Sequence, residues 1–159
     1  MDTLYIVIPA YNESENIKRT IEEWCPVVEK HNGGGASRLV IINDGSRDDT
    51  YEIASAECET RPLLTVLTKP NGGHGSTVLY GYRYALENGA DYIFQTDSDG
   101  QTDPAEFEKF WQIREATTPF SETAQAAATA FPRCRGKVLC AVLWTYFHVS
   151  VPDANARSV

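Results

Sequence analysis

Two carboxylates that could bind a metal ion, Asp97 and Asp99, directly follow the apolar run Tyr92 to Phe94. Side chains two positions apart on an extended chain share a face, so these carboxylates and the amide oxygen of Gln101 can converge on one cation. Oxygen ligands of this kind suit Mg²⁺ or Mn²⁺, which keep coordination positions open for phosphate oxygens. The motif therefore predicts a divalent metal that holds a diphosphate. The alternative is an ordinary turn, in which Asp, Ser and Gly are common.

The overall composition limits the kinds of partner. The chain has 159 residues, 42% hydrophobic and 23% charged, which is typical of one globular domain with a real core. Its formal net charge is −8. No nucleic-acid partner is expected, because that binding needs a basic face. Phosphate binding by so acidic a chain would depend on a metal ion.

The cysteines and the apolar segments indicate a cytoplasmic location. Cys25, Cys58, Cys134 and Cys140 form no CxxC pair and follow no secretory signal, which favours reduced thiols. The apolar stretch Val138 to Val151 is shorter than the ~20 residues that a membrane span requires. It could instead lie on the inner face of a membrane as a peripheral contact, or form a core helix with a buried face.

Apolar runs alternate with segments of helical periodicity along the first two thirds of the chain. The expected strands are Leu4 to Ile8, where Pro9 stops the run, Leu39 to Ile42, Leu63 to Leu67 and Tyr92 to Phe94. The expected helices are Glu13 to Val28, Asp48 to Cys58, Ser76 to Gly89 and Asp103 to Ile113. The third starts at Ser76, closes at Gly89 and has Val78, Leu79, Tyr82 and Leu86 on one side. This alternation predicts an α/β fold, in which a mostly parallel sheet is covered on both faces in a three-layer sandwich.

Each expected strand is followed by a polar cluster. These clusters are Pro9 to Glu13, Asn43 to Ser46, Asn71 to Ser76 and Asp97 to Gln101. In parallel α/β sheets, ligands bind outside the carboxyl ends of the strands. We therefore expect the four clusters to face one crevice.

Read in order, the clusters resemble a known family. The motifs I-V-I-P-A-Y-N-E-S-E-N-I, I-N-D-G-S-R-D-D-T, K-P-N-G-G-H-G-S-T and D-S-D-G-Q-T-D-P are similar to those of a family 2 glycosyltransferase of the GT-A fold, in its dolichyl-phosphate-mannose-synthase-like branch. The resemblance runs from Leu4 to about Trp111. It implies a Rossmann-like, nucleotide-diphospho-sugar transferase fold, with a nucleotide-sugar-binding core at residues 1–115.

The resemblance also implies roles for single residues. Asp97 and Asp99 would be catalytic and, with Gln101, would hold the divalent metal, while Asp44 would accept a hydrogen bond from the nucleotide base. The Gly-rich turn would bring backbone N–H groups near phosphate or sugar, and His74 is expected to be a solvent-facing loop residue. The donor would contact Pro9, Ala10, Tyr11, Glu13, Asp44, Gly73, Ser76, Asp97 and Ser98. Without the resemblance, Tyr11 and Glu13 read as an exposed loop residue and a first-turn acid.

The activity implied is transfer of a sugar, with inversion, from a UDP- or GDP-linked donor to an acceptor. A lipid phosphate such as a polyprenyl phosphate is the candidate acceptor. One alternative is an incomplete fragment that binds only nucleotide and metal. Another is a nucleotidyltransferase, which is disfavoured because the chain has no basic Gly-rich phosphate loop near the first strand.

The resemblance weakens after the expected fourth helix. Residues 116–136 are rich in Ala and Thr and lack the G-N-R or G-S-R motif of the family. One hypothesis is a shifted reading frame in this segment, and another is an irregular linker. Residues 137–159 are interpreted as an amphipathic helix and a truncated end of the domain, where V-P-D-A-N-A is followed by Arg157, Ser158 and Val159 instead of the expected P-F-R.

Overall fold

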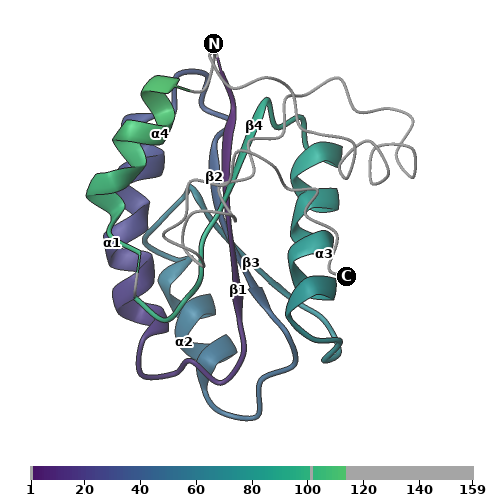
Figure 1. Ribbon diagram of the computed structural model, residues 1–159. Helices are drawn as coiled ribbons and strands as arrows, with labels where there is room; N and C mark the ends of the chain where they lie inside the picture. Colours follow the sequence, from purple (N-terminus) through teal and green to yellow (C-terminus); the bar gives the residue numbers. More distant parts are fainter. Residues whose placement is uncertain (1, 101, 114–159) are drawn as a thin grey trace, which may run out of the picture.

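The computed structural model describes residues 2–100 and 102–113 and shows a parallel four-stranded sheet in the order β3-β2-β1-β4 (Figure 1). The strands are β1 (Leu4–Ala10), β2 (Arg38–Asn43), β3 (Leu64–Thr68) and β4 (Tyr92–Gln95). The helices are α1 (Ile17–Lys30), α2 (Thr50–Glu57), α3 (His74–Glu87) and α4 (Phe107–Ile113), the last preceded by the 3-10 turn Pro104–Glu106. The predicted alternation of strands and helices is confirmed.

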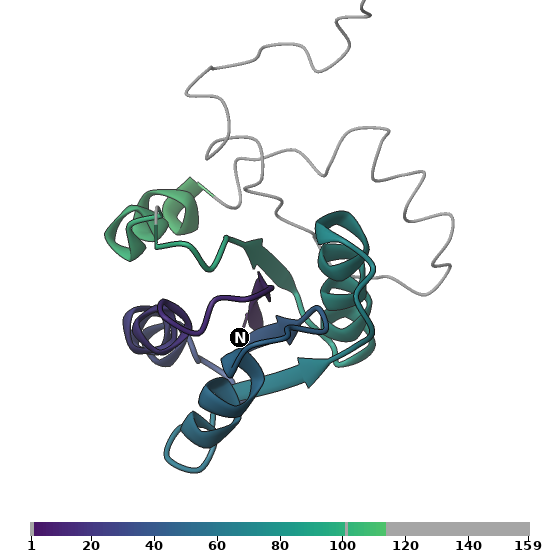
Figure 2. The same ribbon diagram turned by 90° about the horizontal axis from the view of Figure 1, so that it is seen from below.

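Helices cover both faces of the sheet. Seen along the strands, α1, α2 and α4 lie on one face and α3 lies on the other (Figure 2). Parallel strands need long crossover connections, and here helices supply them. The predicted three-layer sandwich is confirmed.

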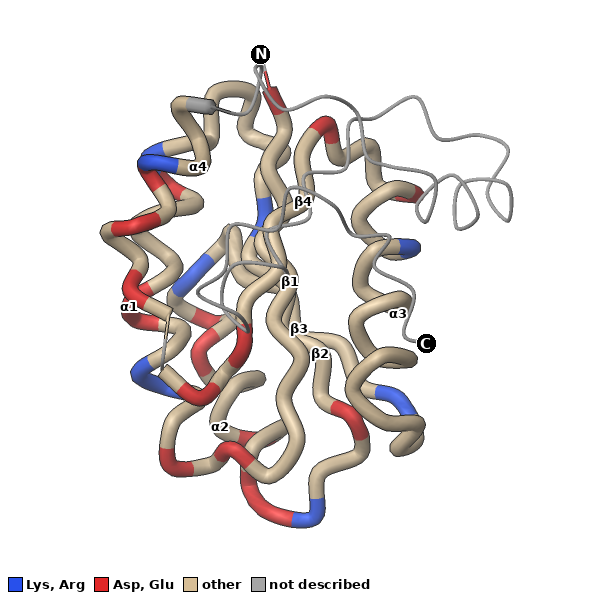
Figure 3. Tube along the Cα trace, viewed as in Figure 1, with Lys and Arg blue, Asp and Glu red and all other residues tan. Residues whose placement is uncertain are grey.

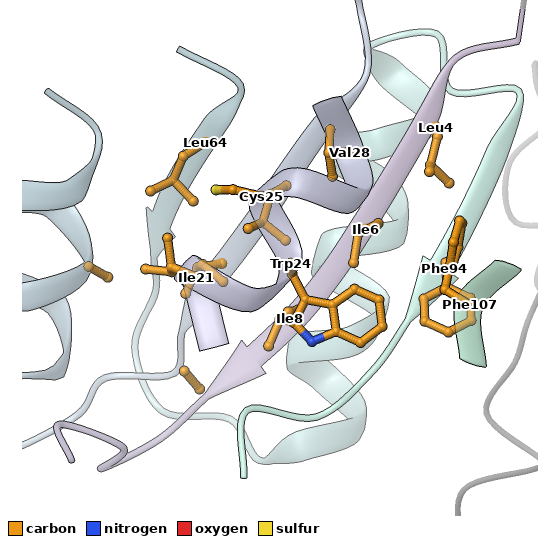
Figure 4. Close-up of a cluster of buried hydrophobic side chains, with 14 of the residues drawn as sticks. Leu4, Ile6, Ile8, Ile21, Trp24, Cys25, Val28, Leu64, Phe94 and Phe107 are labelled. Atoms are coloured by element: carbon orange, nitrogen blue, oxygen red, sulfur yellow. The ribbon is translucent and has the colours of Figure 1, made fainter. Parts of the chain in front are cut away.

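The core between the sheet and α1 is aromatic where β4 meets the helices. Trp24 of α1 lies against Phe94 of β4 with ring centroids 5.6 Å apart, and Phe107 of α4 meets Phe94 edge-on at 4.9 Å (Figure 4). Leu4, Ile6 and the rest of β1 are buried, which explains its continuous apolar sequence. Packing on both faces therefore fixes the central strand that leads into the first polar cluster.

Several boundaries differ from the sequence-based expectation. Strand β1 does not stop at Pro9 but continues to Ala10, and Pro9 pairs in register with Ile42. Helix α1 begins at Ile17 instead of Glu13, because the N–H groups of Asn16 and Ile17 both donate to the carbonyl of Glu13 and close a turn first. Helix α3 begins at His74, two residues before the expected Ser76.

Helix α3 presents to the sheet a face that coincides only in part with the expected apolar side, since Tyr82 and Leu86 pack against the core and Leu79 does not. Its buried residues are Thr77, Gly81 and Ala85, whereas Leu79 is 45% exposed and Val78, Tyr82 and Leu86 are only partly buried. A Cβ atom on Gly81 would lie 2.4 Å from both Ile42 Cδ1 and Val7 Cγ1. Small residues are required on this face because α3 runs very close to β1 and β2. The predicted end of the helix is right: Gly89 has φ 81° and its N–H donates to Leu86 O at 3.1 Å.

The loops after β1 and β2 hold each other in place. Asn12 adopts φ 56°, which Asn tolerates, and its N–H donates to Ser46 Oγ at 3.0 Å. The N–H of Arg47 returns a bond to Asn12 Oδ1 at 2.9 Å. The N–H of Glu13 donates to Thr50 Oγ1 at 2.8 Å. The first polar cluster is thus fixed by backbone-to-side-chain bonds from the second.

Asp48 is the anchor of this loop pair. Its carboxylate accepts from Ser14 N at 3.1 Å and from both the N–H and the hydroxyl of Thr50. Burial acts to raise the pKa of Asp48, but the hydrogen bonds from Thr50 and Ser14 outweigh it and lower the pKa to about 2. The ionised form is therefore the one that holds the two loops together.

Several expectations fall outside the described residues. They concern Gln101, the segments 116–136 and 137–159, the stretch Val138 to Val151, Cys134 and Cys140. Within the described part, Cys25 and Cys58 are free thiols. No helix among residues 2–100 and 102–113 combines the length and the apolar character that crossing a membrane demands.

Replacing Gly81 by Ala should destabilise the fold by about 1–3 kcal/mol, because the new methyl group would overlap Val7 and Ile42. Gly75→Ala is the matched control in the same helix, since its Cβ would meet nothing within 4 Å. The control should be neutral or stabilise the chain by up to ~1 kcal/mol through helix propensity. Denaturant unfolding measures both, and equal effects of the two variants would contradict the close packing of α3.

Acid unfolding should report on Asp48. Because its pKa is lower when folded than the ordinary value of 3.8, its stabilisation is complete above about pH 4 and is lost as the pH falls towards 2. Asp48→Asn should cost about 1–2 kcal/mol at neutral pH and flatten the fall in stability between about pH 4 and 2.

The neighbouring exposed Asp49→Asn provides the control for this measurement, because the Asp49 side chain makes no capping hydrogen bond. It removes the same charge without removing the loop contacts. Thermal melts across this pH range compare the variants. If the stability of Asp48→Asn falls between about pH 4 and 2 as steeply as that of the wild type, the anchoring role is ruled out.

Candidate functional site

A cavity of about 740 Å³ lies where β1, β2 and β4 end and α3 begins. Its size falls within the range usual for small-molecule sites. Most of the residues predicted to bind donor or metal line it. The full lining is Pro9, Ala10, Tyr11, Glu13, Asp44, Asn71, Gly73, His74, Thr77, Gln95, Asp97, Ser98 and Asp99.

Two predicted site residues are not found in this wall. Ser76 is exposed and does not line the cavity, because α3 starts at His74 and carries Ser76 into its first turn. Gln101 lies outside the described residues. The structure thus brings three of the predicted polar clusters together through Glu13, Asp44 and Asp97, and the Gly-rich cluster through Gly73.

The wall formed by the end of β1 is partly open. Pro9 and Ala10 are buried as the last residues of the strand, whereas Tyr11 is 42% exposed. The Glu13 carboxylate accepts from Asn16 Nδ2 at 2.9 Å, which holds it at the start of α1. This wall offers one flat aromatic ring and one carboxylate to a ligand.

Asp44 organises the Gly-rich turn. The residue is 4% exposed, and its carboxylate accepts from Lys69 Nζ and from the N–H groups of Gly72 and Gly73 at 3.0 and 2.9 Å. Burial alone would raise the pKa of Asp44, but the bonds from Lys69 and Gly72 hold it below its ordinary value. The N–H groups of Gly72 and Gly73 were expected to face a ligand. They are instead used by Asp44.

The loop after β2 needs glycine where it meets the Gly-rich turn. Gly45 has φ 64°, and a Cβ there would lie 2.8 Å from Asn71 N. Asn71 Nδ2 donates to Asp44 O at 3.0 Å. The ends of β2 and β3 are therefore closely joined beside the first residue of α3.

The acidic pair faces this cavity from the end of β4. Burial raises the pKa of Asp97, and the nearby Asp99 raises it further, while His74 and a hydrogen bond from Gln95 act in the opposite direction. His74 Nε2 lies 3.9 Å from Asp97 Oδ1, and Gln95 Nε2 donates to the same oxygen at 3.2 Å. The intervening Ser98 is buried and its carbonyl accepts from Thr20 Oγ1 at 3.1 Å, which ties the acidic pair to α1.

The carboxylates at this end of the cavity fit a hard divalent cation whose remaining coordination positions a ligand would fill. Among the described residues, no group of three or more His, Cys, Asp and Glu side chains is arranged to hold a metal ion. Asp97 and Asp99 supply two carboxylates whose mutual repulsion a cation would relieve. One or two carboxylates together with substrate phosphates form the usual environment of Mg²⁺.

Sequence reasoning missed three groups that shape the site: Lys69, Thr77 and Gln95. Only Gln95 carried a usable signal, since it lies two residues before Asp97 and shares its face of the strand. His74, predicted to be a solvent-facing loop residue, has a side chain that is 62% exposed. It is nevertheless the first residue of α3 and lines the cavity.

The acidic character of the chain is visible around the site. Asp and Glu gather on α1, α2 and the loops at the end of the sheet where the strands finish (Figure 3). The cavity wall includes the carboxylates of Glu13, Asp44, Asp97 and Asp99. Lys69 pairs with Asp44. An anionic ligand would thus meet several carboxylates in this cavity.

Known proteins resemble this chain in sequence and in fold. A dolichyl-phosphate beta-glucosyltransferase of Trichomonas vaginalis is 31% identical over 122 residues, covering 74% of this chain and 35% of the relative. A UDP-N-acetylglucosamine-dolichyl-phosphate N-acetylglucosaminyltransferase of Methanococcus voltae is 30% identical over 123 residues, covering 69% and 46%. The chain thus spans less than half the length of these relatives.

A solved structure agrees with the fold. The glucosyl-3-phosphoglycerate synthase of Mycobacterium tuberculosis, crystallised with Mn²⁺, UDP and glucosyl-3-phosphoglycerate, superposes with a TM-score of 0.53 at 25% identity, covering 74% of this chain and 40% of that one. The family model described as Glycosyl transferase family 2 matches residues 5–119, from β1 to beyond α4. Since this match takes in every described strand and helix, the chain belongs to glycosyl transferase family 2.

Proposed function

We propose that this chain carries the donor site of a glycosyltransferase, which moves a sugar from a nucleoside-diphosphate sugar to an acceptor with the help of a divalent metal. The observation that carries this proposal is the meeting of Asp97 and Asp99 with Glu13 and Asp44 in one cavity of about 740 Å³. Family membership supports the reaction class. The alternative of a nucleotidyltransferase has no comparable support.

The residues divide the donor between two walls. Pro9, Ala10, Tyr11 and Glu13 would bind the nucleoside, with Tyr11 as a surface for stacking. Asp44 would accept a hydrogen bond from the base, because a carboxylate oxygen keeps acceptor capacity beyond the bonds it already makes. This arrangement suits a base that presents an N–H group, as uracil and guanine do.

The opposite wall would bind the diphosphate through a metal. Asp97 and Asp99, with Gln101, are the proposed ligands, and Mg²⁺ or Mn²⁺ bound there would offset negative charge on the departing nucleoside diphosphate. The crystal of the Mycobacterium tuberculosis relative holds Mn²⁺ together with UDP. Asp97 would also lie near the ribose, as the resemblance to the family implies.

The acceptor is proposed to be a lipid phosphate. The two relatives above are named for transfer to dolichyl phosphate. A phosphate acceptor is already anionic, so it needs no strong general base. It would attack the anomeric carbon from the face opposite the diphosphate, which inverts that carbon. Such a substrate would bring the protein to the inner face of a membrane as a peripheral contact.

A second candidate is a piece that binds donor and metal without transferring sugar. It is favoured by one observation, namely that the chain spans only 35% and 46% of the two relatives. Both candidates predict the same donor binding. Turnover with a polyprenyl phosphate separates them.

Calorimetric titration with UDP- and GDP-sugars tests the proposal. Binding should depend on Mn²⁺, and Asp99→Ala should weaken the metal-dependent binding at least about tenfold, which corresponds to ~1.4 kcal/mol. The control is Glu59→Gln, which removes one exposed acid beyond the end of α2 and away from the cavity wall. Nucleotide binding that is equally strong with EDTA, or unchanged in Asp99→Ala, would refute the metal-assisted donor site.

A further inference from the structure

Gln95, the last residue of β4, is a polar residue at a position that otherwise takes apolar side chains. It is 6% exposed and pairs in register with Val7 of β1. Ile93, two residues earlier on the same face, belongs with Val7 to the apolar cluster beneath α3. An apolar residue would suit this position as well as Gln does, so the amide needs another explanation.

The Gln95 amide is only half satisfied. Its Nε2 donates to Asp97 Oδ1 at 3.2 Å, whereas its buried Oε1 has no hydrogen-bond partner among the described residues. Turning the amide over would place Oε1 against a carboxylate oxygen, and two acceptors cannot bond. The orientation is therefore set by Asp97, and a buried acceptor without a partner destabilises the folded chain.

The contact selects one oxygen of Asp97. Gln95 Nε2 approaches Oδ1 at 3.2 Å and His74 Nε2 approaches the same atom at 3.9 Å. In the part of the chain that the structure describes, no group donates a hydrogen bond to Asp97 Oδ2. The carboxylate is thereby held with one oxygen engaged and the other available to a cation.

We propose that Gln95 is a positioning residue, which orients the Asp97 carboxylate for a divalent cation and is retained although its unpaired oxygen lowers the stability of the fold. This inference rests on the proposed function and adds a residue to it. Groups that orient metal ligands in this way are worth roughly 10–100-fold in metal affinity. The proposal predicts that an apolar residue in place of Gln95 leaves the stability of the fold equal or higher and weakens metal binding.

Two neighbouring variants separate these effects in the full chain. Gln95→Met keeps the length of the side chain and removes both polar atoms. Thr96→Val is the matched control, because Thr96 is 1% exposed, its Oγ1 is also buried without a partner among the described residues, and it does not line the cavity. Both variants should melt at the wild-type temperature or above it when no metal is present.

Only Gln95→Met should alter metal binding. We expect its Kd for Mn²⁺, measured by calorimetry with the metal alone, to rise at least about tenfold, and that of Thr96→Val to stay at the wild-type value. Metal-free binding of the uncharged nucleosides uridine and guanosine, which carry no phosphate, should be the same in all three proteins. This last measurement shows whether the cavity itself has survived the substitution.

The possible failures are distinguishable. A lower melting temperature for Gln95→Met without metal, or a loss of metal-free nucleoside binding, would assign Gln95 a purely structural role and overturn the inference. A wild-type Kd for Mn²⁺ in Gln95→Met would overturn it while leaving the proposed function intact. If the wild-type chain binds no Mn²⁺, both the proposed function and the inference fail.

Discussion

The site depends on the buried carboxylate of Asp44. This group follows β2, yet it binds Lys69 after β3 and the N–H groups of Gly72 and Gly73 just before α3. One anion therefore joins two segments that are distant in sequence, the loop after β2 and the loop between β3 and α3. Its lowered pKa keeps it charged under ordinary conditions, so the turn is fixed before any ligand arrives. A wall formed in advance does not have to be ordered during binding.

Charge is the reason why we propose a metal ion in this cavity. Among the described residues that line it, His74 is the one side chain able to carry a positive charge, against the acids Glu13, Asp44, Asp97 and Asp99. Lys69 is occupied by Asp44 and is not part of the wall. A nucleoside diphosphate would meet a negative surface. In the proposed function, a cation held by the acids after β4 would supply the attraction.

The sequence predicted the order of the layers and the meeting of the polar clusters, because both follow from buried parallel strands with ligands at their carboxyl ends. It failed where packing between elements decides. Helical spacing placed Leu79 on one side of the helix with Val78, Tyr82 and Leu86, but the close approach of α3 selects Gly81 for the sheet and leaves Leu79 45% exposed. The contact of Lys69 with Asp44 was hidden as well, since it depends on a partner whose placement only the folded chain establishes.

The acids of this chain perform two different tasks, and their surroundings tell them apart. Asp44 and Asp48 receive several hydrogen bonds each, and the pKa of each carboxyl is lowered, so both serve the scaffold. Asp97 is partly buried next to another acid, its pKa is raised, and Gln95 supports only one of its oxygens. A carboxylate without enough donors is costly in a folded protein unless a ligand supplies what is missing. The first pair therefore holds the loops of the cavity in place, whereas Asp97 and Asp99 are the acids that the proposed function assigns to a cation.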